Sequence, residues 1–123
     1  MPITSYRDLD AWKVGMDIAR GAYTLTRSFP KDELFGLTSQ LRRAAVSIPA
    51  NIAEGHGRES TQDFMRFLRI AQGSLKELET LLTISADTGA TTPEASAPML
   101  ELADREGRIL RALLRSLADK DQS

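Results

Sequence analysis

The spacing of apolar residues along the chain predicts four helices and no strands. Apolar positions recur every three or four residues in four segments, and the two-residue alternation of a half-buried strand is absent from the sequence. We place the helices at about residues 7–28, 36–55, 61–87 and 94–118. Long helices with short connections pack as antiparallel neighbours. The expected fold is therefore all-α, an antiparallel up-and-down four-helix bundle, formed by residues 1–123 as a single domain.

The second predicted helix is apolar on two sides. Its main apolar face consists of Leu37, Leu41, Ala44, Ala45, Ile48 and Ile52. Small residues form another apolar surface on the opposite side: Val46, Pro49, Ala50 and Ala53. Because an ordinary surface helix has only one apolar face, this second surface predicts contact with a neighbouring subunit.

Pro49 lies inside this helix, where a proline removes one backbone hydrogen bond at a cost of roughly 3 kcal/mol. The apolar and polar spacings continue to Glu54, so we predict one helix that is kinked at Pro49. The alternative is a helix that ends near Ile48, followed by a short second one. The segment Gly55-His56-Gly57 is expected to end the helix by C-cap chemistry, with His56 in an exposed loop.

The first predicted helix has two apolar stripes. The stronger one consists of Leu9, Trp12, Met16, Ala19, Tyr23 and Thr26. The weaker one contains Val14, Ile18 and Leu25, with Gly21 and Ala22. Glycine disfavours a helix by about 1 kcal/mol relative to alanine. Gly15 and Gly21 therefore predict the close approach of another helix.

Local signals mark the ends of the other elements. Ser5 and Ser60 each precede an aspartate by three residues and are expected to cap a helix. Lys31 to Phe35 reads as a linker before the second helix. Gly89 is expected to end the third helix, Pro93 to begin the fourth, and the residues from Ala118 to form a frayed tail.

Polar residues at helical spacing predict an internal network. Glu106 falls within the apolar stripe of the fourth helix, and a buried carboxylate needs a partner or it neutralises. Arg43 and Asn51 are its natural partners on the second helix, and Glu79 is a second acid at the edge of the third. We predict a structural network that fixes helix register, made of Arg43, Ser47, Asn51, Glu54, Glu79 and Glu106.

The composition gives little support to catalysis. The chain has no cysteine, which excludes thiolate metal sites and cysteine nucleophiles, and His56 is its only histidine. No nucleophile with a base is evident, so we expect no enzyme, no metal and no cofactor. Neither an apolar run of about 20 residues nor a signal peptide is evident. We therefore expect a cytoplasmic protein without a membrane partner.

The 16 basic and 17 acidic residues give a net charge of −1. This near-neutral charge argues against a protein that attracts nucleic acid over its whole surface. A local basic surface is still expected on the second and third helices and the turn between them. It consists of Arg42, Arg58, Arg66, Arg69 and Lys76. A symmetric oligomer would multiply this surface into a phosphate-contacting one, and the alternative is an ordinary solvated helix face.

The segment from Gln40 to Gly55 reads QLRRAAVSIPANIAEG. It resembles the four-helix-bundle family first noticed as reading frames inside intervening sequences of bacterial 23S ribosomal RNA genes. The resemblance extends to Asp8-Leu9, Trp12, Phe29-Pro30, Phe64 to Leu68, Ala71, Ser74 and Glu77-Leu78-Glu79.

This resemblance implies a ring-like homopentamer. It also implies kinship to the accessory variability protein of diversity-generating retroelements, a basic protein associated with nucleic acid and a reverse transcriptase. RNA or DNA and a reverse transcriptase are therefore the partners that the resemblance suggests. Our first hypothesis is a non-enzymatic, homo-oligomeric helical bundle that binds nucleic acid or a nucleoprotein partner. The alternative is a purely protein-binding or structural assembly protein with no nucleic-acid role.

Overall fold

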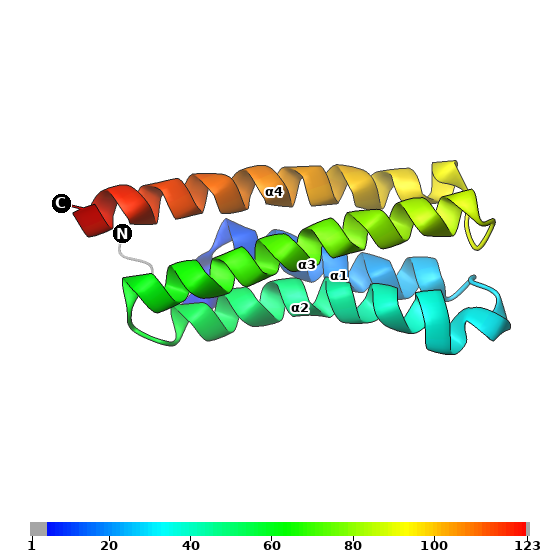
Figure 1. Cartoon of the computed structure of the whole chain (residues 1–123), viewed down its shortest axis with the longest axis horizontal. Helices are drawn as coiled ribbons and strands as arrows, with labels where there is room; N and C mark the ends of the chain where they lie inside the picture. Colours follow the sequence, from blue (N-terminus) through cyan, green and yellow to red (C-terminus); the bar gives the residue numbers. More distant parts are fainter. Residues whose placement is uncertain (1–4, 123) are drawn as a thin grey trace.

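The computed structural model describes residues 5–122, which form a bundle of four α-helices (Figure 1). These are α1 (Asp10–Thr26), α2 (Ser39–His56), α3 (Thr61–Asp87) and α4 (Pro93–Gln122). Each helix packs against the next one in sequence, and α4 packs back against α1. Successive helices run in opposite directions, as Figure 1 shows. The expected all-α up-and-down bundle is confirmed, and none of the described helices is long and apolar enough to cross a membrane.

Most helix ends follow the local chemistry of the sequence. The hydroxyl of Ser60 accepts a hydrogen bond from the backbone N–H of Asp63 at 3.3 Å and caps α3. α4 begins at Pro93, as expected. Gly89, in the turn between α3 and α4, has a φ of +82°, a conformation that glycine adopts readily.

Three boundaries differ from the sequence-based expectation. Tyr6–Asp8 forms a 3₁₀ turn, so α1 begins only at Asp10. Leu34–Thr38 forms a wide π-type turn instead of the first turn of α2, because Gly36 adopts non-helical angles of φ −108° and ψ −111°. The tail expected to fray from Ala118 is helical as far as Gln122. The prediction of a frayed tail from Ala118 was therefore wrong.

α2 continues through Pro49 without a break, so the alternative of a helix that ends near Ile48 is wrong. The kink at Pro49 stays a prediction. The proline is buried, and its Cβ lies 3.3 Å from the position that a Cβ on Gly15 of α1 would occupy. The close approach expected at Gly15 is therefore present, and it gives the proline ring its space.

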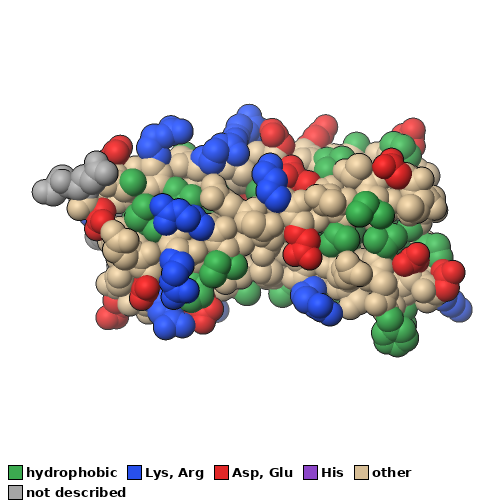
Figure 2. All heavy atoms as spheres, in the orientation of Figure 1, with side chains coloured by type: hydrophobic (Ala, Val, Ile, Leu, Met, Phe, Trp, Pro, Cys, Tyr) green, Lys and Arg blue, Asp and Glu red, His purple; other side chains and the backbone are tan. Residues whose placement is uncertain are grey.

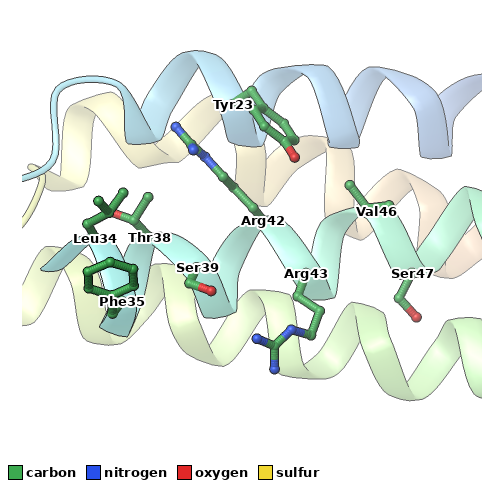
Figure 3. Close-up of a pocket in the computed structure, with 9 residues that line it drawn as sticks. All are labelled: Tyr23, Leu34, Phe35, Thr38, Ser39, Arg42, Arg43, Val46 and Ser47. Atoms are coloured by element: carbon green, nitrogen blue, oxygen red, sulfur yellow. The ribbon is translucent and has the colours of Figure 1, made fainter.

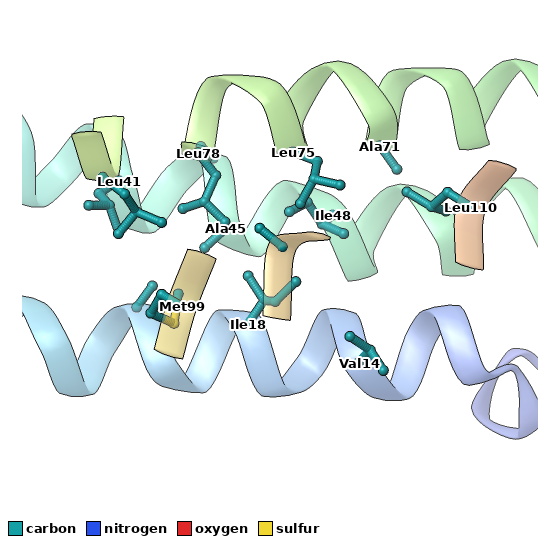
Figure 4. Close-up of a cluster of buried hydrophobic side chains, with 14 of the residues drawn as sticks. Val14, Ile18, Leu41, Ala45, Ile48, Ala71, Leu75, Leu78, Met99 and Leu110 are labelled. Atoms are coloured by element: carbon teal, nitrogen blue, oxygen red, sulfur yellow. The ribbon is translucent and has the colours of Figure 1, made fainter. Parts of the chain in front are cut away.

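The core lies along the bundle axis and receives side chains from all four helices (Figure 4). Ile18, Ile48, Leu75 and Leu110, one from each helix, are at most 1% exposed. Burying a side chain of this size stabilises a fold by about 1.5–3 kcal/mol. The core therefore ties every helix to its neighbours.

α1 buries mainly the weaker of its two apolar stripes in the core. The buried residues are Val14, Ile18 and Ala22, together with Ala11, Gly15 and Thr26. Trp12 and Met16 are only half-buried, and Tyr23 is 43% exposed. The stripe with the larger side chains is therefore only partly buried. Small residues on the inner face let α1 approach its neighbours closely.

Candidate functional site

Several exposed large apolar side chains border a groove between α1 and α2. Phe35 is 92% exposed, Leu34 50%, Tyr23 43% and Val46 41%. They surround a hollow of about 630 Å³, shown in Figure 3 and called the α1–α2 groove here. Its lining is Tyr23, Leu34, Phe35, Thr38, Ser39, Arg42, Arg43, Val46 and Ser47. Single exposed apolar residues are common, whereas a cluster around a hollow is typical of an interaction site.

The turn before α2 positions Phe35. The carboxylate of Glu33 accepts a hydrogen bond from the backbone N–H of Leu37 at 3.2 Å and so closes the turn over Gly36. A Cβ on Gly36 would lie 2.7 Å from an oxygen of that carboxylate. A side chain at position 36 would therefore displace this carboxylate from the hydrogen bond that closes the turn. Phe35 lies outside the regular register of α2 and presents its ring to solvent.

Arg42 forms a wall of the groove. Its Nε donates a hydrogen bond to Oγ1 of Thr26 at 2.8 Å, and its guanidinium lies 4.6 Å from the centre of the Tyr23 ring. In Figure 3, Arg42 and Val46 point toward α1, while Arg43 and Ser47 point toward α3. The contacts of Arg42 with α1 hold it in a cation–π arrangement. It is therefore half-buried and tied to the fold.

The predicted polar network forms only around Ser47. The hydroxyls of Ser47 and Ser74 share a hydrogen bond of 2.7 Å that links α2 to α3. The Asn51 amide donates to the Ser47 hydroxyl at 2.9 Å and to the Ser47 carbonyl at 2.8 Å. The network therefore joins two helices through three short side chains. Ser74 was not assigned to it from the sequence.

The charged members expected in this network lie elsewhere. Glu54 pairs with Arg58 at 3.3 Å, and Glu79 pairs with Lys76 at 2.9 Å. Arg43 is exposed and forms no salt bridge within residues 5–122. These residues are therefore not brought together with Glu106.

Glu106 is fully buried, and neither of its carboxylate oxygens has a hydrogen-bond partner in the described part of the chain. Burial raises the pKa of Glu106 from 4.5 to about 8, against the opposing positive charge of Arg105. Its predicted pairing with Arg43 and Asn51 is therefore wrong. The carboxyl group holds its proton at neutral pH, because neutralisation replaces the missing partner.

The basic residues do not form one surface. Arg42 faces α1, whereas Arg58 and Arg66 lie 5.2 and 4.6 Å from the ring centre of Phe67. Arg66 also pairs with Asp63 at 3.8 Å. Arg58 and Lys76 are paired with the glutamates named above, and Arg69 forms no salt bridge within residues 5–122. Three of the five predicted cations are thus partly neutralised by neighbouring acids.

The small-residue surface of α2 is partly accessible. Val46 lines the groove, Ala50 is exposed, and Ala53 is half-buried. Pro49 is buried against Gly15, so its assignment to a subunit interface was wrong. His56 is half-buried as well. Its ring packs edge-on against Phe64 at 5.6 Å, in place of the expected exposed loop position.

Comparison with known proteins identifies the family. The family model for the 23S rRNA-intervening sequence protein matches residues 7–112. The chain belongs to this family. Membership in the 23S rRNA-intervening sequence protein family confirms the resemblance carried by the segment from Gln40 to Gly55. The family match indicates no catalytic class.

The crystal structure of a similar protein supports the fold of this chain. That protein has unknown function and comes from the S23 ribosomal protein family of Bacteroides thetaiotaomicron VPI-5482. The two chains are 23% identical, and the match covers 85% of this chain and 95% of that one with a TM-score of 0.79. No curated protein matches the sequence.

Sequence reasoning missed the groove of this family member. Leu34 and Phe35 were assigned to a linker, and Tyr23 to an apolar stripe of the first helix. One feature of the sequence could have indicated the groove. Leu-Phe is a pair of large apolar residues directly after a charged linker, next to a glycine that interrupts the helical pattern. Such a pair, placed before the regular helix begins, predicts an exposed contact.

Proposed function

We propose that this protein is a non-enzymatic assembly protein that self-associates through the α1–α2 groove. The observation that carries the proposal is the 92% exposure of Phe35 beside a hollow of about 630 Å³. Fully burying such a side chain contributes about 1.5–3 kcal/mol. An isolated chain obtains none of that free energy from Phe35. A bound partner accounts for its position.

A second copy of the chain is the partner that fits best. Each copy carries both a projecting aromatic ring and a hollow lined by Tyr23, Val46 and the stem of Arg42. When the Phe35 side chain of one copy enters the hollow of the next, the two copies make a head-to-tail contact. Repeated head-to-tail contacts form a closed, ring-shaped oligomer when the rotation between neighbouring copies adds up to a full turn. The homopentamer suggested by the family resemblance is a ring of this kind.

Protein association is favoured over nucleic-acid binding as the role of this groove. Of the two arginines in its lining, Arg42 contacts Thr26 and Tyr23, and Arg43 points toward α3 (Figure 3). Arg58, Arg66 and Lys76 each have an acidic neighbour, and the chain carries a net charge of −1. Phosphate binding depends on cations that are free to replace counterions. These observations support protein association, and not phosphate binding, as the role of the α1–α2 groove.

Replacing Phe35 with serine is expected to weaken self-association by about 10- to 150-fold at each interface, from the loss of about 1.5–3 kcal/mol of burial. The unfolding free energy of a single chain should change by less than about 0.5 kcal/mol, because Phe35 is not part of the core. Light scattering across a dilution series measures the mass, and urea unfolding measures the stability.

Ile84→Ser is the matched control, since Ile84 is a 40% exposed apolar side chain of α3 outside the groove. It should leave the mass unchanged. A wild-type chain that is monomeric at 100 µM, or a Phe35→Ser variant with the wild-type mass at every concentration, would exclude the proposal.

A further inference from the structure

A second hollow, of about 390 Å³, lies between α3 and α4 on a surface separate from the α1–α2 groove. Its lining is Arg69, Gln72, Gly73, Leu75, Lys76, Gly107 and Arg111, and we call it the α3–α4 hollow. Figure 2 shows Lys and Arg side chains gathered over the half of this face where α3 begins and α4 ends. The hollow is therefore a basic site between two helices.

Two of its cations have no acidic partner. Within residues 5–122, neither Arg69 nor Arg111 forms a salt bridge. By contrast, Arg66 and Arg108, three residues earlier on the same helices, pair with aspartates at 3.8 and 3.2 Å. No acid stands three or four residues from Arg69 or Arg111 in the sequence.

The third cation is partly neutralised, because Lys76 pairs with Glu79 at 2.9 Å. The two arginines therefore supply most of the positive charge of the hollow. An arginine keeps this charge at every physiological pH.

Glycines keep the hollow open. A Cβ on Gly73 would meet no atom within 4 Å, so packing within the chain does not require a glycine there. Glycine inside a helix is unfavourable relative to alanine. A Cβ on Gly107 would lie 3.3 Å from a guanidinium nitrogen of Arg111, so the missing side chain leaves room for the arginine to lie over the α4 backbone.

We propose that the α3–α4 hollow binds the phosphate group of a nucleotide, either free or as one unit of a single-stranded nucleic acid. Guanidinium groups match phosphate oxygens with two parallel hydrogen bonds, and Arg69 and Arg111 approach the hollow from opposite helices. The Gln72 amide adds a donor and an acceptor for the sugar or base. The volume lies in the range of small-molecule sites. This site does not depend on self-association through the groove.

The test is an NMR titration of the ¹⁵N-labelled chain with adenosine monophosphate and with a hexauridylate strand, each at 50 and 200 mM salt. Binding is expected to shift the amide signals of Gly73 and Gly107 and to weaken as salt increases. The double variant Arg69→Gln with Arg111→Gln should bind at least tenfold more weakly. Its matched control, Arg20→Gln in α1 with Arg27→Gln directly after α1, removes the same charge elsewhere and should change the affinity less than twofold.

The variant Gly73→Ala tests whether Gly73 leaves room for a ligand or serves only the structure of the chain. The added methyl group meets no neighbour within 4 Å, so the variant should fold and its thermal midpoint should rise. It should nevertheless bind at least fivefold more weakly, because it narrows the hollow. Binding of the strand alone identifies nucleic acid as the source of the phosphate, and binding of both probes identifies the nucleotide itself. No binding of either probe, or equal binding by all the variants, overturns the proposal.

Discussion

Raising the pH from 5 to 9 is expected to reduce the unfolding free energy by on the order of 4 kcal/mol through Glu106 alone. Burial raises the pKa of this carboxyl group to about 8 in the folded chain, from an ordinary value of 4.5. Between these two values the folded chain keeps a proton that the unfolded chain has released. The stabilising contribution is therefore complete below about pH 4.5 and lost by about pH 8.

Urea unfolding of the wild type and of Glu106→Gln at pH 5, 7 and 9 measures this effect. Glutamine has a similar shape and does not titrate. Between pH 5 and pH 9 the unfolding free energy of the variant should therefore rise by on the order of 4 kcal/mol relative to that of the wild type. Glu101→Gln, an exposed acid on the same helix, is the control and should follow the wild-type curve. Parallel pH curves for the wild type and Glu106→Gln would show that the buried carboxyl group does not control stability.

Glu106 belongs to a contact of three helices that explains two other unusual residues. A Cβ on Gly15 would lie 3.0 Å from Oε2 of Glu106 and 3.3 Å from Cβ of Pro49. A glycine in α1, a proline in α2 and an acid in α4 are each unfavourable when considered alone. Their mutual packing shows why they occur together: the glycine makes room for both of the other side chains.

The parts of this structure that depend on local chemistry could be predicted from the sequence. The bounds of α3 follow from Ser60 and from the three- and four-residue spacing of its leucines. The close approach of helices at Gly15 and Gly21 follows from the cost of glycine in a helix. At Gly21 a Cβ would lie 2.5 Å from the sulfur of Met99. These signals lie within one helix and need no knowledge of its neighbours.

The parts that depend on tertiary packing could not be predicted in the same way. Both stripes of α1 have helical spacing, and only the close packing of its neighbours selects the one with small residues. The missing partner of Glu106 is likewise a property of three helices. The exposure of Phe35 depends on the non-helical angles of Gly36, which local composition only suggests. The candidate site was therefore harder to predict than the fold.

Gly55→Ala is expected to destabilise the bundle by on the order of 2 kcal/mol, because overpacking typically costs about 1–3 kcal/mol. The added Cβ would lie 2.5 Å from Cβ of Phe67 and 3.3 Å from the backbone oxygen of Phe64. Neither atom moves when a side chain rotates, so α2 and α3 must separate locally. Urea unfolding at constant pH measures the loss.

Gly57→Ala is the control that distinguishes the two glycines beside His56. Both were expected to end the helix. In the structure Gly57 has an ordinary φ of −73°, and its Cβ would meet only backbone oxygens at 3.5 and 3.6 Å. The left-handed conformation in this turn belongs to Glu59, with a φ of 64°. Gly57→Ala should therefore change the unfolding free energy by less than about 0.5 kcal/mol. If Gly57→Ala reduced the unfolding free energy more than Gly55→Ala, these glycines would act by ending α2. Gly55 would then not be the contact point between α2 and α3.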